Sequence, residues 1–425
     1  MTINRRDLMK YTGAAGVFGL LASSGGHKLF AAPSAQKKRL VMVMAQGGWD
    51  TTYCLDPKTQ SAKVDVPKEA GEGITRFGDL DIQTGPTRPG VTGFFTKYAS
   101  QAAVVRGISV GSVAHQECVK RMATGTRNET NPDLCAIVAH SNGNDLPLPY
   151  LILGDTAFAG EYAVSTGRVG ATNQILALLD PAQAYETGGK KPYATTSAED
   201  AILAKYAGAT RDRLQATRGS QGYNKRRVDD FVQSIERGKK LTAAKAGFGT
   251  RGRTLAIANQ VDLALDALEQ DVSHTVMLNT RLGWDTHDTI TDQSGFYETT
   301  FAALTTLLDE MTLRKGRTPG SKMIDDTVIV CFSEFSRTPK LNENLGKDHW
   351  PITSALVLGA GVKGGRAFGA TTSSVETTPI DFTTGAASAS GHVLTSSNFA
   401  AGVLSLCGVD PAGRIDGEVF DAFVR

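Results

Sequence analysis

The segment LVMVMAQGGWD, residues 40–50, decides the fold. It begins with an uninterrupted apolar run and ends in two glycines, a tryptophan and an aspartate. Such a run is typical of a strand that is buried on both faces of a sheet. Glycines after the run favour a tight turn. Comparable strands are predicted at residues 102–110, 147–154, 272–280, 327–333 and 352–361.

Segments with helical periodicity lie between and after these strands, at residues 115–125, 131–141, 291–312 and 396–410. Helices that alternate with buried strands indicate a mostly parallel sheet that is covered on both faces. We therefore predict an α/β fold, a three-layer sandwich with a mostly parallel central sheet.

The middle of the chain has a different character. Residues 197–219 and 224–240 are amphipathic and carry charges of both signs, which is typical of solvated helices. The block 155–271 is predicted to be a helical insertion or cap over the sheet. The whole of residues 36–425 is then one domain with an insertion.

Two predicted helices carry capping signals at their starts. Ser197 with Asp200 resembles a capping box. Ser397 or Asn398 is expected to cap the last helix.

Residues 1–35 are predicted to be a twin-arginine export signal. The run NRRDLMK, residues 4–10, precedes a Gly/Ala-rich apolar stretch that is too short for a membrane span. We therefore expect a periplasmic or secreted protein that meets the twin-arginine translocase during export. No transmembrane helix is expected in the mature chain. Cleavage stays open because FAAP, residues 30–33, lacks a small-x-small site, and retention as an anchor is the alternative.

The bulk composition excludes some function classes. The chain has 425 residues and a formal net charge of +2, so nothing indicates a nucleic-acid partner. Its five cysteines form no CxxC pair, and their odd number leaves at least one thiol free. The sequence contains no P-loop, dinucleotide fingerprint or GxSxG elbow.

Acids and histidines lie next to the predicted strands, where sites of α/β sheets assemble. Asp285 and His287 are two residues apart, so in an extended segment they face the same side and can share one ion. Asp348 is expected either to ligate the ion or to orient an imidazole. The predicted metal ligands are Asp50, Asp285, His287, Glu334, His349 and Asp348.

Candidate catalytic groups are fewer. Ser112 precedes a predicted helix and is either a nucleophile or an N-cap. Thr51 is a further candidate hydroxyl, and Arg337 either binds an anionic oxygen or pairs with Glu334. His115 and His392 are additional candidates without a decisive partner.

Together these motifs resemble a known family. GGWD, HQE-x5-ATG, GWDTHD, SEFSRTP-x-LNE-x3-KDHWP and the twin-arginine leader are similar to the exported family catalogued as domain of unknown function 1501. That family resembles the alkaline phosphatase and sulfatase superfamily, whose fold is a metal-dependent α/β sandwich.

The resemblance implies a set of roles. It implies a metal-binding Asp50, a nucleophile at Ser112, and two divalent ions of Zn, Mn, Mg or Ca that act on an anionic ester. The implied activity is hydrolysis of phosphate or sulfate esters. Phe335 stands where the superfamily usually has a histidine, and no nucleophile motif is reproduced around Ser112. The alternative is therefore a non-catalytic envelope protein that uses the same fold to bind a partner protein or glycan.

Overall fold

A computed structural model describes residues 37–66, 71–128, 130–169, 196–217, 219–244 and 256–425. At its centre is an eight-stranded sheet with the strand order β12-β4-β11-β8-β1-β7-β5-β6. All six predicted strands are present in it. Its strands are β1 (Arg39–Met44), β4 (Ala102–Ser109), β5 (Tyr150–Ile152), β6 (Thr166–Arg168), β7 (Thr275–Asn279), β8 (Thr327–Phe332), β11 (Ile352–Gly359) and β12 (Arg366–Phe368).

The sheet is parallel except for one strand. β1 pairs in parallel with β7 and β8, whereas β11 is antiparallel to its neighbours β4 and β8. The start of β11 therefore lies at the edge of the sheet where the other strands end. Residues that precede β11 in the sequence consequently meet residues that follow β1, β4, β7 and β8.

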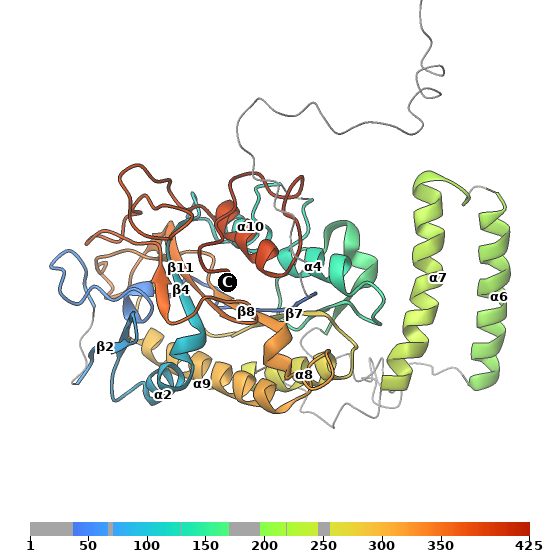
Figure 1. Cartoon of the computed structure of the whole chain (residues 1–425), viewed down its shortest axis with the longest axis horizontal. Coiled ribbons are helices and arrows are strands. Elements are labelled where there is room, and N and C mark those ends of the chain that lie inside the picture. The colour runs from blue at the N-terminus through green and yellow to red at the C-terminus, as the bar shows by residue number, and fades with distance from the viewer. Residues whose placement is uncertain (1–36, 67–70, 129, 170–195, 218, 245–255) are drawn as a thin grey trace, which may run out of the picture. The chain divides into compact units, whose positions relative to one another are not determined.

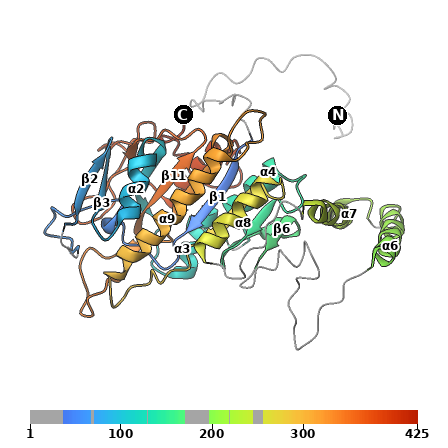
Figure 2. The same ribbon diagram turned by 90° about the horizontal axis from the view of Figure 1, so that it is seen from below.

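Helices cover both faces of the sheet, which gives the three predicted layers (Figures 1 and 2). On one face lie α2 (Pro89–Tyr98), α8 (Ile257–Glu269) and α9 (Asp292–Leu313). On the other lie α3 (His115–Thr124), α4 (Leu134–Asn142) and α10 (Ser396–Leu406). The predicted α/β architecture is confirmed.

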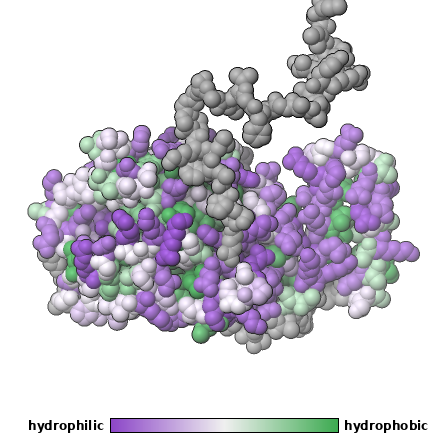
Figure 3. Space-filling model, viewed as in Figure 1, coloured by the Kyte–Doolittle hydropathy of each residue, from purple (hydrophilic) through white to green (hydrophobic). Residues whose placement is uncertain are grey.

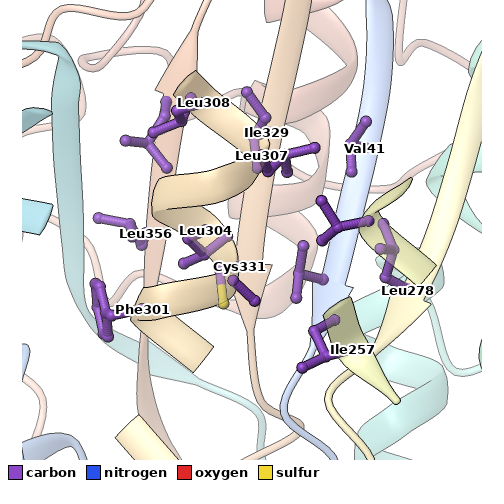
Figure 4. Packing of buried hydrophobic residues seen from close by; sticks show 14 of the residues in the cluster. Val41, Ile257, Leu278, Phe301, Leu304, Leu307, Leu308, Ile329, Cys331 and Leu356 are labelled. Carbon is purple, nitrogen blue, oxygen red and sulfur yellow. The ribbon is translucent and has the colours of Figure 1, made fainter. Parts of the chain in front are cut away.

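Apolar side chains from α9 fill the space between this helix and the sheet. Figure 4 shows Leu304 and Leu307 of α9 beside Ile329 and Cys331 of β8. These side chains are nearly or completely buried. Each fully buried aliphatic side chain of this kind contributes about 1.5–3 kcal/mol to folding.

Several short elements connect these layers. β2 (Gly73–Phe77) and β3 (Leu80–Thr84) form a separate hairpin, and β9 (Ser336–Arg337) pairs with β10 (His349–Trp350). The short 3-10 helices are η1 (Thr51–Tyr53), η2 (Ala99–Gln101), η3 (Gly160–Ser165) and η6 (Met323–Asp326).

The predicted helical insertion differs from the structure in its extent. α8 lies inside the predicted block, but nine of its residues are buried and it belongs to the body of the domain. α6 (Ser197–Gln215) has no buried residue and is followed by α7 (Gly222–Ala243). α6 packs against α7, and its role as a cap over the sheet stays a prediction.

Both predicted helix caps are displaced. The capping box of α6 joins Thr196 to Glu199, one residue before the predicted pair. The N-cap of α10 is Thr395, and Asn398 is the third helical residue that completes its capping box. Each true cap has an extended backbone, which frees its hydroxyl to accept a hydrogen bond from the helix.

Two further expectations concern the whole chain. All five cysteines are free and buried, so they act as core residues. Within the described ranges, no helix combines the length and the apolar character that a membrane crossing requires. The predicted export signal lies outside the described residues.

Candidate metal centre

Three histidines and one aspartate meet at the edge of the sheet where the parallel strands end. His115 is the first residue of α3, which follows β4. Asp285 and His287 follow β7, and His349 lies in β10, directly before the antiparallel β11. One ligand atom from each of His115, Asp285 and His349 lies within 4.8 Å of the others.

Each imidazole is held in place through its Nδ1 atom. The Nδ1 of His115 lies 2.8 Å from the carboxylate of Glu334, and the Nδ1 of His287 lies 3.1 Å from Asp348. The Nδ1 of His349 lies 2.8 Å from the carbonyl oxygen of Val113. A carbonyl oxygen only accepts a hydrogen bond, so the Nδ1 of His349 carries the proton and its Nε2 keeps a free lone pair. Carboxylate partners favour the same tautomer in the other two rings.

The Nε2 atoms converge on Asp285. The Nε2 atoms of His287 and His349 are 2.9 Å apart, and they lie 3.1 and 3.2 Å from Oδ1 of Asp285. The Nε2 of His115 lies 3.3 Å from Oδ2 of Asp285. Ligand atoms around a tetrahedral zinc ion are ~3.4 Å apart. The distances among the Nε2 atoms of His287 and His349 and the Oδ1 atom of Asp285 are close to this value.

One of these nitrogens has no hydrogen-bond partner. The Nε2 atom of His115 is itself buried and unpaired, although a third of the side chain is exposed. An unpaired buried acceptor is costly in a folded protein. A cation between the imidazoles and Asp285 would satisfy it. The donor set therefore fits a divalent metal ion.

Asp285 is kept ionised by its neighbours. Burial opposes its ionisation, but the hydrogen bond from Arg337 and the contact with His349 outweigh burial and hold the pKa of Asp285 at about 2. The Nη2 of Arg337 lies 2.6 Å from Oδ1 of Asp285. Asp285 is consequently a carboxylate at neutral pH, as a metal ligand must be.

Two glycines allow β1 to approach this site. A Cβ atom on Gly47 would lie 2.7 Å from the backbone nitrogen of Asp285, and one on Gly48 would lie 2.4 Å from the ring of Phe335. Both glycines have positive φ angles, +124° and +89°. The Gly-Gly pair at the end of β1 is thus required by close packing and by backbone conformation together.

Two predicted ligands, Glu334 and Asp348, contact histidines of the donor group. Glu334 is completely buried, and its carboxylate accepts hydrogen bonds from the Gly47 N–H and the Ser333 hydroxyl in addition to its contact with His115. Asp348 contacts the Nδ1 of His287 on the side of the ring away from the donors. In this structure both carboxylates contact the Nδ1 atom of an imidazole, and their predicted roles as metal ligands stay predictions.

Asp50 also lies outside the donor group. Its Oδ1 accepts hydrogen bonds from the N–H and hydroxyl of Thr52, and its Oδ2 lies 2.6 Å from the ammonium of Lys347. Neither the Asp50 nor the Lys347 side chain is exposed. Lys347 holds this carboxylate in the structure, and the role of Asp50 as a metal ligand stays a prediction.

Arg337 is bound to several protein groups beside the donors. Its guanidinium is fully buried and donates to the carbonyl oxygens of Gly47, Gly48, Trp284 and Lys347 as well as to Asp285. All of these contacts are with protein groups, and binding of a substrate oxygen by Arg337 stays a prediction. Arg337 does not pair with Glu334.

The predicted hydroxyls are engaged elsewhere. Thr51 is buried and lies 3.2 Å from the hydroxyl of Ser336. Ser112 donates to the carboxylate of Glu117 at 2.8 Å and accepts from the N–H of Ala114. Ser112 therefore supports the start of α3, close to the capping alternative, although Ala114 is the N-cap.

His392 does not join the group. It is exposed, its backbone pairs with Ile380, and its ring lies 5.9 Å from that of Phe382. His115 is more central than its sequence context indicated. Lys347 was not among the predicted residues, although KDHWP, residues 347–351, places it directly before Asp348 and His349.

The sequence as a whole identifies the family. A family profile described as "Protein of unknown function (DUF1501)" matches residues 37–413. This chain belongs to that family. The family predicted from the motifs is thereby confirmed. No curated protein matches this DUF1501 chain.

Solved structures with a similar fold come from the superfamily that the motifs implied. One is a protein in the alkaline phosphatase superfamily from Vibrio parahaemolyticus, with 9% identity, a TM-score of 0.40, and coverage of 89% of this chain and 68% of that chain. The lipoteichoic acid synthase of Listeria monocytogenes has 9% identity and a TM-score of 0.40, with 92% and 76% covered. The phosphonate monoester hydrolase of Agrobacterium radiobacter has 12% identity and a TM-score of 0.35, with 91% and 78% covered. These likenesses are distant, and the chemistry below rests on the residues of this chain.

Proposed function

We propose that this protein is a metal-dependent hydrolase of phosphate or sulfate esters that is exported by the twin-arginine pathway. The observation that supports it most strongly is the convergence of three oriented imidazoles on one ionised carboxylate. Imidazole-rich donor sets suit zinc and related transition metals, whereas Mg²⁺ and Ca²⁺ prefer oxygen ligands. Zn²⁺ is thus the first ion to test, and Mn²⁺ the second.

The residues around the ion would have separate tasks. His115, His287, His349 and Asp285 would hold the cation. When bound, a divalent cation supplies Lewis acidity toward an ester oxygen and toward an attacking water. Glu334 and Asp348 would keep the Nδ1 proton on their imidazoles.

The site is open on the side that a substrate would approach. The side chains of Asp285 and His287 are 48% and 41% exposed, whereas Glu334 and Arg337 behind them are fully buried. α3 begins at His115, so the positive end of its dipole lies beside the donors and favours an anionic ester. The proposed substrates are therefore anions that bind from solvent.

The proposed export depends on the N-terminal sequence. It rests on Arg5 and Arg6 with Leu8, Met9 and Lys10 around them. Replacing both arginines by lysine in the full chain should trap the protein inside the cell. A double variant that is exported normally would contradict the assignment.

The hydrolase proposal is tested by turnover. The protein is stripped with a chelator, reloaded with Zn²⁺ or Mn²⁺, and assayed with p-nitrophenyl phosphate, bis-p-nitrophenyl phosphate and p-nitrophenyl sulfate. Hydrolysis of at least one ester by the reloaded protein, and its loss in His287→Ala, is expected. Reloaded protein that contains the metal but cleaves none of the three contradicts the proposed activity.

A second function is favoured by a specific observation. The described hydroxyl candidates are engaged with protein groups, and α6 exposes Ile202, Leu203 and Tyr206 by 68%, 56% and 72%. Figure 3 shows that the surface over α6 and α7 is otherwise mainly hydrophilic. A non-catalytic envelope protein that binds a partner protein or glycan would fit these exposed side chains. Metal without turnover, measured in one preparation, would favour this second function.

A further inference from the structure

A fully buried ion pair lies next to the metal centre. The Nζ of Lys347 is 2.6 Å from Oδ2 of Asp50, and neither side chain is exposed. A buried carboxylate requires a compensating cation, because an uncompensated buried charge is strongly destabilising. Asp50 obtains that cation from the protein itself.

Lys347 is fixed at this position by its own backbone. Its N–H donates to the carbonyl oxygen of Thr286 at 3.1 Å, and its carbonyl oxygen accepts from Arg337 at 3.0 Å. Thr286 lies between the donors Asp285 and His287. The ammonium is therefore anchored to the segment that carries two of the proposed metal donors.

Arg337 neutralises the neighbouring carboxylate of Asp285 in the same way. It contacts Asp285 on one side and the backbone of Gly47 and Gly48 on the other. Between Asp285 and the end of β1 there is consequently a guanidinium. Gln293 fills the remaining space, since its amide donates to Gly48 and Thr286 and its oxygen accepts from the N–H of Asp50.

The charges of this network leave room for one divalent cation. Four carboxylates and two basic side chains are linked through the contacts above, namely Asp50, Asp285, Glu334, Asp348, Arg337 and Lys347. With neutral imidazoles the network has an excess of two negative charges. A single divalent ion neutralises this excess, and a second ion would make the network cationic.

Beside Glu334, an aromatic side chain packs against the donor group. Phe335 packs its ring against His115 and His349, with centroids 4.7 and 4.4 Å away. A phenyl ring supplies no donor atom. The carbon atoms of the Phe335 ring therefore occupy this side of the donor group.

We infer that this centre holds one divalent ion and that Lys347 permanently occupies the position of a second cation, at Asp50. The inference rests on the proposed metal centre and narrows it from two ions to one. Lys347 is a positioning residue here: it neutralises Asp50 and tethers the segment that carries Asp348 and His349.

The number of ions per chain tests this inference. Full-length protein and variants are saturated with Zn²⁺, exchanged into metal-free buffer, and analysed for zinc per chain. Wild type should hold one ion. Lys347→Ala leaves the Asp50 carboxylate without its cation and should hold two, whereas Asp50→Asn/Lys347→Ala should return to one.

The measured number of ions separates the one-ion inference from the proposed metal centre. Two ions in wild type, or one ion in a folded Lys347→Ala variant, would overturn the inference and leave the metal centre standing. No ion in wild type would overturn the proposed metal centre as well. If Lys347→Ala does not fold, Asp50→Asn/Lys347→Met removes both charges, and two ions in that variant would also overturn the inference.

Discussion

The imidazoles of His287 and His349 face each other with their Nε2 atoms 2.9 Å apart, although the Nδ1 of each ring is already bound to Asp348 or Val113. Two lone pairs at that distance repel unless a proton or a metal ion lies between them. Burial lowers the pKa of His349 in spite of its contact with Asp285, so an additional proton is disfavoured there at neutral pH. A cation bound between the two Nε2 atoms removes this repulsion without an additional proton.

Removing either of these rings should abolish tight metal binding. We expect His287→Ala and His349→Ala each to weaken Zn²⁺ affinity by more than ~100-fold, because a direct ligand is worth more than the 10–100-fold of an orienting group. Titration with a competing chelator measures the change. His392→Ala is the matched control, since this exposed histidine lies outside the donor group, and its affinity should equal that of wild type. If either His287→Ala or His349→Ala binds Zn²⁺ with the affinity of wild type, the replaced histidine is not a metal ligand.

Glu334→Gln tests the orienting role of a buried carboxylate. Glutamine can still accept a hydrogen bond from His115 but carries no charge. The contact with Glu334 raises the pKa of His115, and burial opposes it, so the variant should lower that pKa. Zn²⁺ affinity should fall by about 10–100-fold. A complete loss of binding with the fold intact would instead indicate that Glu334 is itself a ligand.

Arg337→Met separates a positioning role from substrate contact. The variant removes the hydrogen bonds from Arg337 to the carbonyl oxygens of Gly47 and Lys347 and to Asp285, whereas the carbonyl oxygens of Gly48 and Trp284 keep Gln293 as a donor. We therefore expect a loss of about 3 kcal/mol or more in the free energy of unfolding. Urea denaturation measures this loss. Normal stability combined with a higher KM would show that Arg337 meets the substrate after all.

Ser112→Ala distinguishes a nucleophile from a support of the helix start. The hydroxyl is bonded to Glu117 and Ala114, so its removal should lower stability by about 1 kcal/mol and leave turnover within a few-fold of wild type. Turnover and Tm are measured on the same preparation. A loss of turnover by several orders of magnitude at unchanged Tm would identify Ser112 as the nucleophile.

His274 should make the fold sensitive to acid. Burial and the nearby Arg317 lower its pKa from 6.5 to about 3, and its ring accepts from Arg317 while contacting the Lys38 carbonyl. Its folded-state pKa lies below the unfolded value, so its stabilising contribution is complete above pH 6.5. The contribution is lost as the pH falls toward 3, where the loss is on the order of 4 kcal/mol.

Denaturation at several pH values between 7 and 4 measures how steeply the free energy of unfolding changes with pH. His274→Gln, which does not titrate, should have a shallower dependence on pH than wild type. Identical slopes in the two proteins would assign the acid sensitivity to other groups.

The strands could be read from the sequence because buried parallel strands are long apolar runs, as residues 40–45 show. The position of His349 is understandable only with the topology, since it depends on β11 being antiparallel. Cap positions shifted by one or two residues because neighbouring hydroxyls fit the same motif, as Thr196 and Ser197 do. Such choices depend on backbone conformation rather than on residue type.

The roles of charged residues were the least predictable part. Lys347 and Arg337 look like solvated charges in the sequence, and their burial follows from contacts with residues far away in the chain. Glu334 was expected to be a ligand because it follows a strand. In the fold, His115 lies between Glu334 and Asp285, so a residue 219 positions away decides whether the carboxylate binds metal or orients an imidazole.

The central claim is that one cation binds among His115, His287, His349 and Asp285, with His287, His349 and Asp285 as the most closely spaced donors. A crystal of the Zn²⁺-loaded protein, measured on both sides of the zinc absorption edge, locates the ion directly by anomalous scattering. The account predicts an anomalous peak ~2.0–2.2 Å from the Nε2 atoms of His287 and His349 and from a carboxylate oxygen of Asp285. No peak among these three residues in loaded protein would contradict it.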